Sequence, residues 1–143
     1  MSSAAIQVAI FERLSGYPGL TALLVAGGTG VYEYVPQTEA SEDDSFFPYV
    51  TVGDDDIEGW DTDTDDGIEA TLRVHTWSRH KGRLETKQIQ EQVYQALHHH
   101  GLLVDGVPVV LLHFVDSTAG PDPDGRTYHG VSTFRLLMER RVV

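Results

Sequence analysis

The chain begins with apolar residues at the spacing of one face of a helix, three to four positions apart. These residues are Ile6, Ile10, Phe11 and Leu14. Ser2 or Ser3 before them can cap the helix, and the turn residues at 15–19 end it. Residues 20–25 favour a short second helical turn, and the glycines of 27–30 favour a turn.

Alternation of apolar and polar residues then predicts three strands, at 31–35, 47–53 and 68–77, with a polar surface loop at 37–45 between the first two. The third strand alternates most clearly. Its expected buried face carries Ile68, Ala70, Leu72 and Val74, opposite Glu69, Thr71, Arg73 and His75.

The second half of the chain predicts a helix over 83–100, closed by Gly101, and strands at 107–117 and 127–139. The intervening PDPDG joins these two strands as a hairpin. This order predicts the α+β class: an antiparallel or mixed β-sheet of about five strands with helices packed on one face. With no repeat or linker, residues 1–143 are expected to form a single domain.

Composition narrows the classes of function. A hydrophobic fraction of 41% is enough for a folded core, so wholesale disorder is not expected. The absence of cysteine removes disulfides, thiolate metal sites and cysteine nucleophiles, which fits a reducing compartment. No apolar run reaches membrane-spanning length, and the N-terminus does not resemble a signal peptide. We therefore expect a protein without membrane partners that is made and used in the cytoplasm.

The charge is unevenly divided. The net charge is −12; residues 1–72 hold fifteen acidic and one basic residue, whereas residues 73–143 hold seven acidic and nine basic ones. An acidic chain disfavours tight binding to nucleic-acid phosphates. The asymmetry instead favours contacts between subunits, where opposite charges set orientation.

The most acidic stretch, residues 54–67, contains seven aspartates and one glutamate but no lysine or arginine. Asp61, Asp63 and Asp65 occupy the first ligand positions of an EF-hand pattern. However, the sixth position is Asp66 rather than glycine, and the twelfth is Leu72 rather than a carboxylate. A looser divalent site is one alternative, because a cation would relieve carboxylate repulsion. The favoured prediction is a solvated hairpin loop.

Other candidates for chemistry are weak. His98, His99 and His100 point in different directions on a helix, so no metal-ligand spacing results. His113 shares a strand face with apolar residues and has no nucleophile motif beside it. The glycines at 27–30 lack the lysine of a phosphate loop. From these residues we predict no catalytic residue, cofactor or metal.

Two features indicate contact with a partner. Trp77 shares a strand face with charged residues, so it is either exposed for an interface or covered by the helix 83–100 or a loop. The one dense basic cluster comes directly after that strand and contains Arg79, His80, Lys81 and Arg83. One alternative is solvated charge at a loop. The other is a subunit interface in which this cluster meets the acidic 54–66 stretch of a neighbouring subunit, with Asp61, Asp63 and Asp65.

Several segments together resemble a known family. In order they are VYEYVP, FPYVTVGDDDIEGWDTDTDDG, EATLRVHTWSRHKGR, ALHHHG, VVLLHFVDS and DPDGRTYHGVSTFRLLME. The chain is similar over about residues 1–140 to the tail-completion, or tail-terminator, proteins of long-tailed phages and gene transfer agents. No single motif carries the likeness, but the order and spacing of PYV, HxWSR and DPDG before RxxHGV are together fairly specific.

The resemblance implies a structural virion protein at the head–tail junction that is not an enzyme. Such proteins cap the tail tube as a ring, usually hexameric, stop tail polymerisation and offer a surface for the head-side connector or stopper protein. The implied partners are other copies of the chain, the tail tube protein and that connector, while DNA passes through without specific binding. A head-side connector or stopper is the alternative role. A metal-dependent hydrolase built on Asp and His residues is a third, less favoured interpretation.

Overall fold

A computed structural model describes residues 3–25, 30–33, 44–61, 66–98 and 101–139. The helices are α1 (Ser3–Ser15), α2 (Pro18–Thr21) and α4 (Leu84–Leu97), with a 3-10 turn at Asp44–Phe46. The strands are β1 (Val31–Tyr32), β2 (Tyr49–Asp61), β3 (Asp66–Ser78), β4 (Leu103–Val104), β5 (Val107–Pro108), β6 (Leu111–Pro121) and β7 (Tyr128–Glu139).

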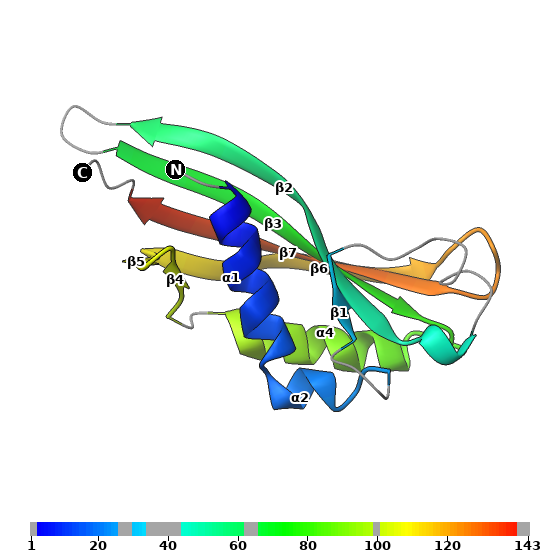
Figure 1. The fold of residues 1–143 in the computed structure, drawn as a ribbon. Coiled ribbons are helices and arrows are strands. Elements are labelled where there is room, and N and C mark those ends of the chain that lie inside the picture. Colours follow the sequence, from blue (N-terminus) through cyan, green and yellow to red (C-terminus); the bar gives the residue numbers. More distant parts are fainter. Residues whose placement is uncertain (1–2, 26–29, 34–43, 62–65, 99–100, 140–143) are drawn as a thin grey trace.

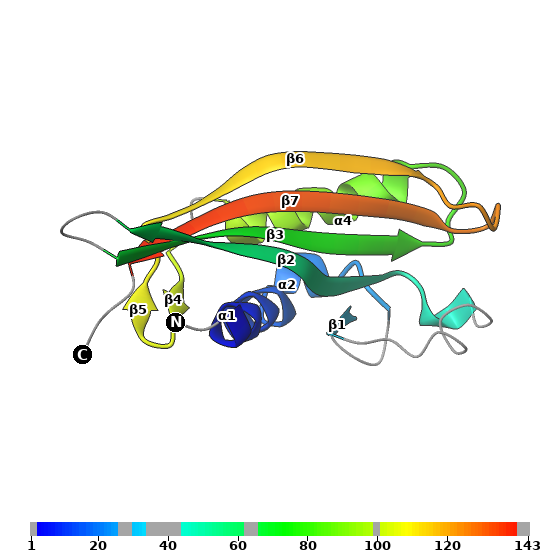
Figure 2. The same ribbon diagram turned by 90° about the horizontal axis from the view of Figure 1, so that it is seen from above.

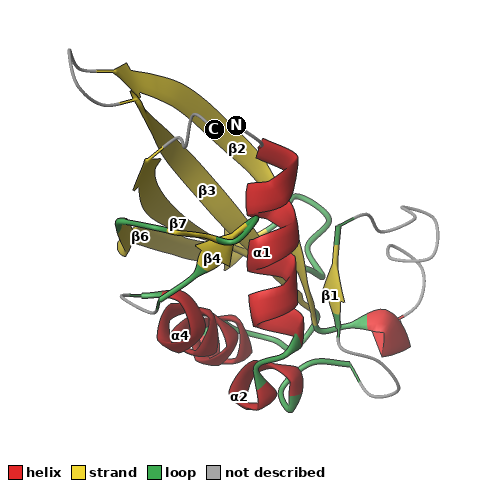
Figure 3. Ribbon diagram, turned by 60° about the vertical axis from the view of Figure 1, so that its left-hand side comes forward, coloured by secondary structure: helices red, strands yellow, loops and turns green. Residues whose placement is uncertain are grey.

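Five of the strands form one mixed sheet in the order β1-β2-β3-β7-β6 (Figure 1). β1 runs parallel to β2, and the other neighbouring pairs are antiparallel. β4 and β5 form a separate two-stranded sheet. The α+β prediction is confirmed, including a mixed sheet with helices on one face. Figures 2 and 3 show α1, α2 and α4 gathered on that side.

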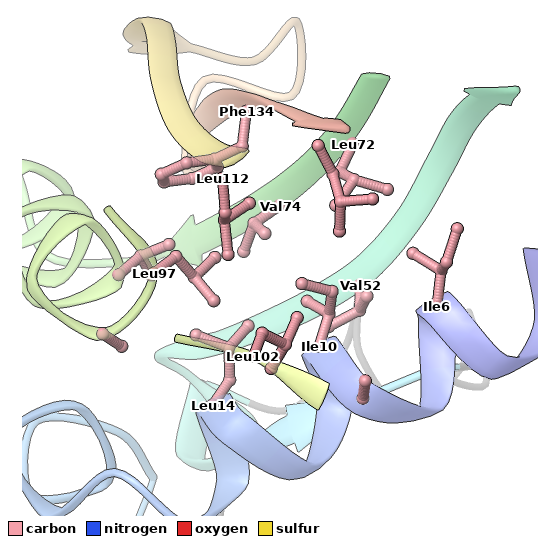
Figure 4. Close-up of a cluster of buried hydrophobic side chains, with 14 of the residues drawn as sticks. Ile6, Ile10, Leu14, Val52, Leu72, Val74, Leu97, Leu102, Leu112 and Phe134 are labelled. Atoms are coloured by element: carbon pink, nitrogen blue, oxygen red, sulfur yellow. The ribbon is translucent and has the colours of Figure 1, made fainter. Parts of the chain in front are cut away.

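The hydrophobic core lies between the helices and the sheet (Figure 4). The predicted alternation of β3 is confirmed, because Ile68, Ala70, Leu72 and Val74 are all buried. Phe134 of β7 is the largest fully buried side chain. Each strand presents every second residue to the helices, so apolar residues at period two collect in one layer. None of the described helices has the length and apolar character needed to cross a membrane.

The acidic stretch differs from the prediction. Residues 54–61 belong to β2 and are not part of a loop; they pair with β3 from Asp55 opposite Leu72 to Asp61 opposite Asp66. Only the connection 62–65, which lies outside the described residues, joins the two strands. Aspartate and glycine have low strand propensity, but pairing with the strongly alternating β3 overrides that local preference. The hairpin was predicted correctly, and its loop was predicted too long.

Other boundaries also shift. α2 begins at Pro18 instead of near Leu20, because proline suits the first position of a helix. α4 ends at Leu97, and the extended backbone of His98 caps it, so Gly101 is not the cap.

The predicted strand 107–117 divides in two. Its first part, β5, pairs with β4 across a tight turn at Asp105 and Gly106, where φ is 52° and 78°. β1 is shorter than predicted, and most of the loop 37–45 lies outside the described residues.

Candidate subunit interface

Trp77 lies on the sheet face opposite the helices, at the end of β3 that leads into α4. It is half-buried and donates a hydrogen bond from Nε1 to Thr51 Oγ1 over 3.3 Å. Its ring stacks on His129, with 3.8 Å between ring centroids, and also faces Tyr49 at 6.2 Å. α4 does not cover Trp77, so cover by the helix, one of the alternatives predicted from the sequence, is excluded. Residues of neighbouring strands supply the contacts of the ring.

A histidine pair extends this stack. His75 Nδ1 and His129 Nε2 are 2.7 Å apart, and His129 Nδ1 lies 3.6 Å from Asp122 Oδ1. Of His75 Nδ1 and His129 Nε2, one donates and the other accepts, according to the tautomers of the two rings. The pair therefore ties β3 to β7 and to the turn after β6.

An aromatic cluster on the same face surrounds Tyr49, which is the buried residue at its centre. Its other members are Tyr32, Phe46, Phe47 and Trp77. Burial raises the pKa of Tyr49 to about 12. The guanidinium carbon of Arg79 lies 4.3 Å from the centre of the Phe47 ring, a cation–π contact. This end of the sheet is thus packed by residues far apart in the sequence.

The predicted basic cluster divides into residues held by the chain itself and residues directed to solvent. Arg79 donates from Nε to Thr127 Oγ1 over 3.1 Å. Arg83 donates from Nε to the carbonyl of Ala119 over 3.2 Å, although it remains exposed. Lys81 is exposed in the loop between β3 and α4. All three lie at one end of β3, as the prediction of one basic patch requires.

The turn between β6 and β7 is anchored by Asp124. This carboxylate accepts hydrogen bonds from Thr127 Oγ1 over 2.6 Å and from the backbone N–H groups of Arg126 and Thr127, each over 2.8 Å. The Thr127 hydroxyl and then these N–H groups hold the pKa of Asp124 at about 2. Arg79 joins the same unit through the Thr127 hydroxyl, so part of the basic cluster has a structural role.

The acidic residues lie at the other end of β3. Asp61 ends β2 opposite Asp66, whereas Asp63 and Asp65 lie outside the described residues. β3 has 13 residues, and at about 3.3 Å per residue its ends are about 40 Å apart. Among the described residues, Asp61 and the basic cluster therefore lie at opposite ends of β3.

Two ion pairs cross the sheet between these ends. Arg73 Nη1 lies 3.2 Å from Asp56 Oδ2, and Arg135 Nε lies 2.9 Å from Glu69 Oε1. Asp55 and Glu58 of β2 are exposed. The described residues contain no group of three or more His, Asp or Glu side chains arranged to hold a metal ion. The arrangement separates acidic from basic residues along one strand, β3.

Several contacts at this site were missed by the sequence analysis. Gln90 is buried on α4 and donates to the carbonyl of Thr118 over 2.7 Å. Its apolar neighbours at helical spacing were recognised, but a polar residue on the buried face gives no periodic signal. The His129 and Asp122 partners of the Trp77 region are also long-range contacts, and only the sequence spacing of the β6–β7 hairpin could have brought them together.

Comparison with known proteins decides the family. The model of the family described as tail completion protein gp17 matches residues 8–139. The chain belongs to this family. Tail completion protein gp17 of Bacillus phage SPP1 is 30% identical over 139 residues, covering 96% of this chain and 95% of the relative. The family resemblance seen in the sequence is thereby confirmed.

Solved structures agree with the tail-completion fold. A chain of the virion of the native gene transfer agent particle aligns with a TM-score of 0.81 at 23% identity, covering 97% of this chain and all of that one. The structure of bacteriophage SPP1 gp17 aligns with a TM-score of 0.59 at 24% identity, covering 97% of this chain and 92% of that one. At these identities the two structures support the fold.

Proposed function

We propose that this tail-completion protein caps the tail tube as a hexameric ring, stops tail polymerisation and forms the surface on which the head-side connector docks. Family membership over almost the whole chain supports a structural role in a virion and a place at the head–tail junction. In this proposal the direct partners are further copies of the chain, the tail tube protein and the head-side protein.

The proposal of a ring rests on the separation of acidic and basic residues along β3. Acidic residues gather where β2 meets β3, and basic residues gather about 40 Å away where β3 leads into α4. Different surfaces at the two ends of a subunit suit a heterologous contact, which closes into a ring when the rotation between subunits allows it. Two like ends would repel each other.

The proposed contact joins the acidic end of one subunit to the basic end of the next. Asp61, Asp63 and Asp65 would face Lys81 and Arg83, because Lys81 is exposed and Arg83 is exposed beyond its bond to Ala119. Arg79 and Trp77 would support this surface from within, since both are held by contacts inside the subunit.

The acidic balance also suits a channel for DNA. A wall with few cations releases few counterions from the DNA phosphates, so DNA would pass without adhering. Membership of a family of tail completion proteins favours a structural role over a catalytic one.

The test is electron microscopy of particles from a producer strain that lacks this gene. The expected result is filled heads beside separate tails of overlong or irregular length, with normal particles restored by the intact gene. Joined particles of normal length would contradict the proposal. Leaking heads with separate tails of normal length would assign the protein to the head-side connector or stopper role instead.

A further inference from the structure

A groove of about 470 Å³ lies between α4 and the edge strand β6. Residues that line it include Lys87, Gln90 and Tyr94 from α4 and Phe114, Ser117 and Thr118 from β6. The volume is within the range of about 300–1,000 Å³ for sites that accept a ligand or several side chains. The groove therefore offers space for a protruding segment of another protein chain.

Side chains from α4 and the loop before it already bind the backbone of β6. Gln90 donates to the carbonyl of Thr118, and Arg83 donates to the carbonyl of Ala119. Phe114 donates its N–H to His98 Nδ1 over 3.1 Å. A partner cannot displace these bonds without cost, so it would meet the side chains that line the groove and would not pair with the backbone of β6 as a sixth strand.

The charges around the groove favour an acidic partner. Lys87 lines the groove, and Arg83 reaches it at Ala119. Lys81 is exposed in the loop that leads into α4. Glu91 also lines the groove and balances the charge of Lys87, so the excess positive charge comes from Arg83 and Lys81 at the end of the groove near Ala119. The densest acidic segment of the same chain is the β2–β3 hairpin.

The hairpin cannot reach the groove of its own subunit. β3 and β6 both pair with β7, and this pairing places Phe114 at the same height along the sheet as Leu72, and Ala119 at the same height as Thr76. Asp66, at the hairpin end, precedes Leu72 by six residues, which is about 20 Å along β3. β7 also lies between β3 and β6. An acidic hairpin in this groove must come from a second copy.

We infer that the groove between α4 and β6 receives the β2–β3 hairpin of a second copy of this chain. The inference rests on the proposed ring and names the surface through which neighbouring subunits join. The hairpin projects at one end of the sheet, away from α4 (Figure 1). The hairpin and the groove are different surfaces, so each subunit can use both at once.

The hairpin has polar groups to offer the groove. In the described part of the chain, β1 pairs with β2 only at Val50 and Thr51, so no described strand covers the outer side of β2 from Val52 to Asp61. Backbone carbonyls on that side can accept hydrogen bonds from Ser117 and Lys87. The exposed carboxylates of Asp55 and Glu58 complement the lysine charge.

Cysteine cross-linking tests the contact cleanly, because the chain has no cysteine of its own. Gly59 is exposed, and a side chain there would meet nothing within 4 Å; Ser117 is an exposed residue of the groove. The test variant is Gly59→Cys with Ser117→Cys. The matched control is Gly59→Cys with Leu103→Cys, because Leu103 is 63% exposed and lies outside the groove.

Each variant replaces the native gene in the producer strain, and purified particles are treated with a short bis-maleimide. The expected result is a ladder of cross-linked subunits from the 59/117 variant and single chains from the 59/103 control. A multimer detected by mass spectrometry of the particles, without a 59/117 cross-link, would overturn the groove contact and leave the proposed ring intact. Particles that hold only single copies of the chain would overturn the ring and the groove contact together.

Discussion

The two ends of the sheet differ in how their polar side chains are used. At the end where β3 leads into α4, Arg79, Thr127 and Asp124 form one hydrogen-bonded unit, and Trp77 stacks on His129. At the hairpin end, exposed carboxylates line a strand that no described strand covers on its outer side. The polar side chains of the first end are held by contacts inside the subunit, whereas Asp55 and Glu58 of the second end are exposed to solvent.

This difference separates stability from association. Removing the side chain of Trp77, Thr127 or Asp124 from the first end should lower the free energy of unfolding, because each of these residues has an internal partner. Removing charge from the hairpin end should hardly change that free energy and should act on subunit contacts. A charged sequence segment is therefore no guide to its role until its partners are known.

The largest expected effect is at Trp77. Trp77→Ala removes a half-buried ring that packs on His129 and Tyr49, and should lower the free energy of unfolding by about 2–3 kcal/mol, less than the loss for a fully buried Trp. Urea unfolding measures the change. Leu103→Ala at an exposed position is the control and should change it by less than about 0.5 kcal/mol. Equal effects of the two would mean that the stack contributes no stability.

Two buried threonines give a sharper contrast. Thr76 Oγ1 has no hydrogen-bond partner among the described residues, whereas Thr127 Oγ1 donates to Asp124 and accepts from Arg79. Thr76→Val should raise the free energy of unfolding by about 1 kcal/mol, because an unsatisfied hydroxyl leaves the core. Thr127→Val should lower it by about 1–2 kcal/mol. Calorimetric melting of both variants measures the signs, and equal signs would contradict this assignment of partners.

The Asp124 turn should make stability depend on acid pH. Its pKa is about 2 in the folded chain and is ordinarily 3.8, so the unfolded chain takes up the proton first as pH falls. The stability from this group is fully present above about pH 4 and is lost as pH falls towards 2. Asp124→Asn should flatten this part of the curve of unfolding free energy against pH. An unchanged slope between pH 4 and 2 would place the acid sensitivity elsewhere.

The smallest effect on stability is expected at the hairpin. Asp55→Asn with Glu58→Gln should change the free energy of unfolding by less than about 0.5 kcal/mol, because both side chains are exposed. The same variant should assemble more slowly and with weaker salt dependence, since exposed interface charges mainly steer association. Light scattering at several salt concentrations measures assembly. A large loss of stability would show that the carboxylates have internal partners.

Local pattern was sufficient to predict the central strands and the major helix. The alternation from Ile68 to Val74 is confirmed because one face of β3 is buried and the other is not, which is the condition that produces period two. The hairpin between β6 and β7 also follows from local turn chemistry at Pro123 to Gly125. The family resemblance, which depends on order and spacing, extended the prediction to a structural virion protein.

Long-range partners could not be read from the sequence. The extension of β2 through Asp55 and Glu58 depends on pairing with β3, which overrides the low strand propensity of acidic residues. The cluster around Tyr49 brings together residues from β1, the 3-10 turn, β2 and β3. Burial of Gln90 depends on a carbonyl 28 residues away. In each case tertiary contact decides the outcome, and local preference does not.

The most direct test of the proposed role is a cryo-electron microscopy reconstruction of the head–tail joint in purified particles. The account predicts a closed ring of this chain at the end of the tail tube, with the β2–β3 hairpin of each subunit against the α4–β6 groove of the next. A joint in which this chain is absent, or is present without contact between its copies, would contradict the account.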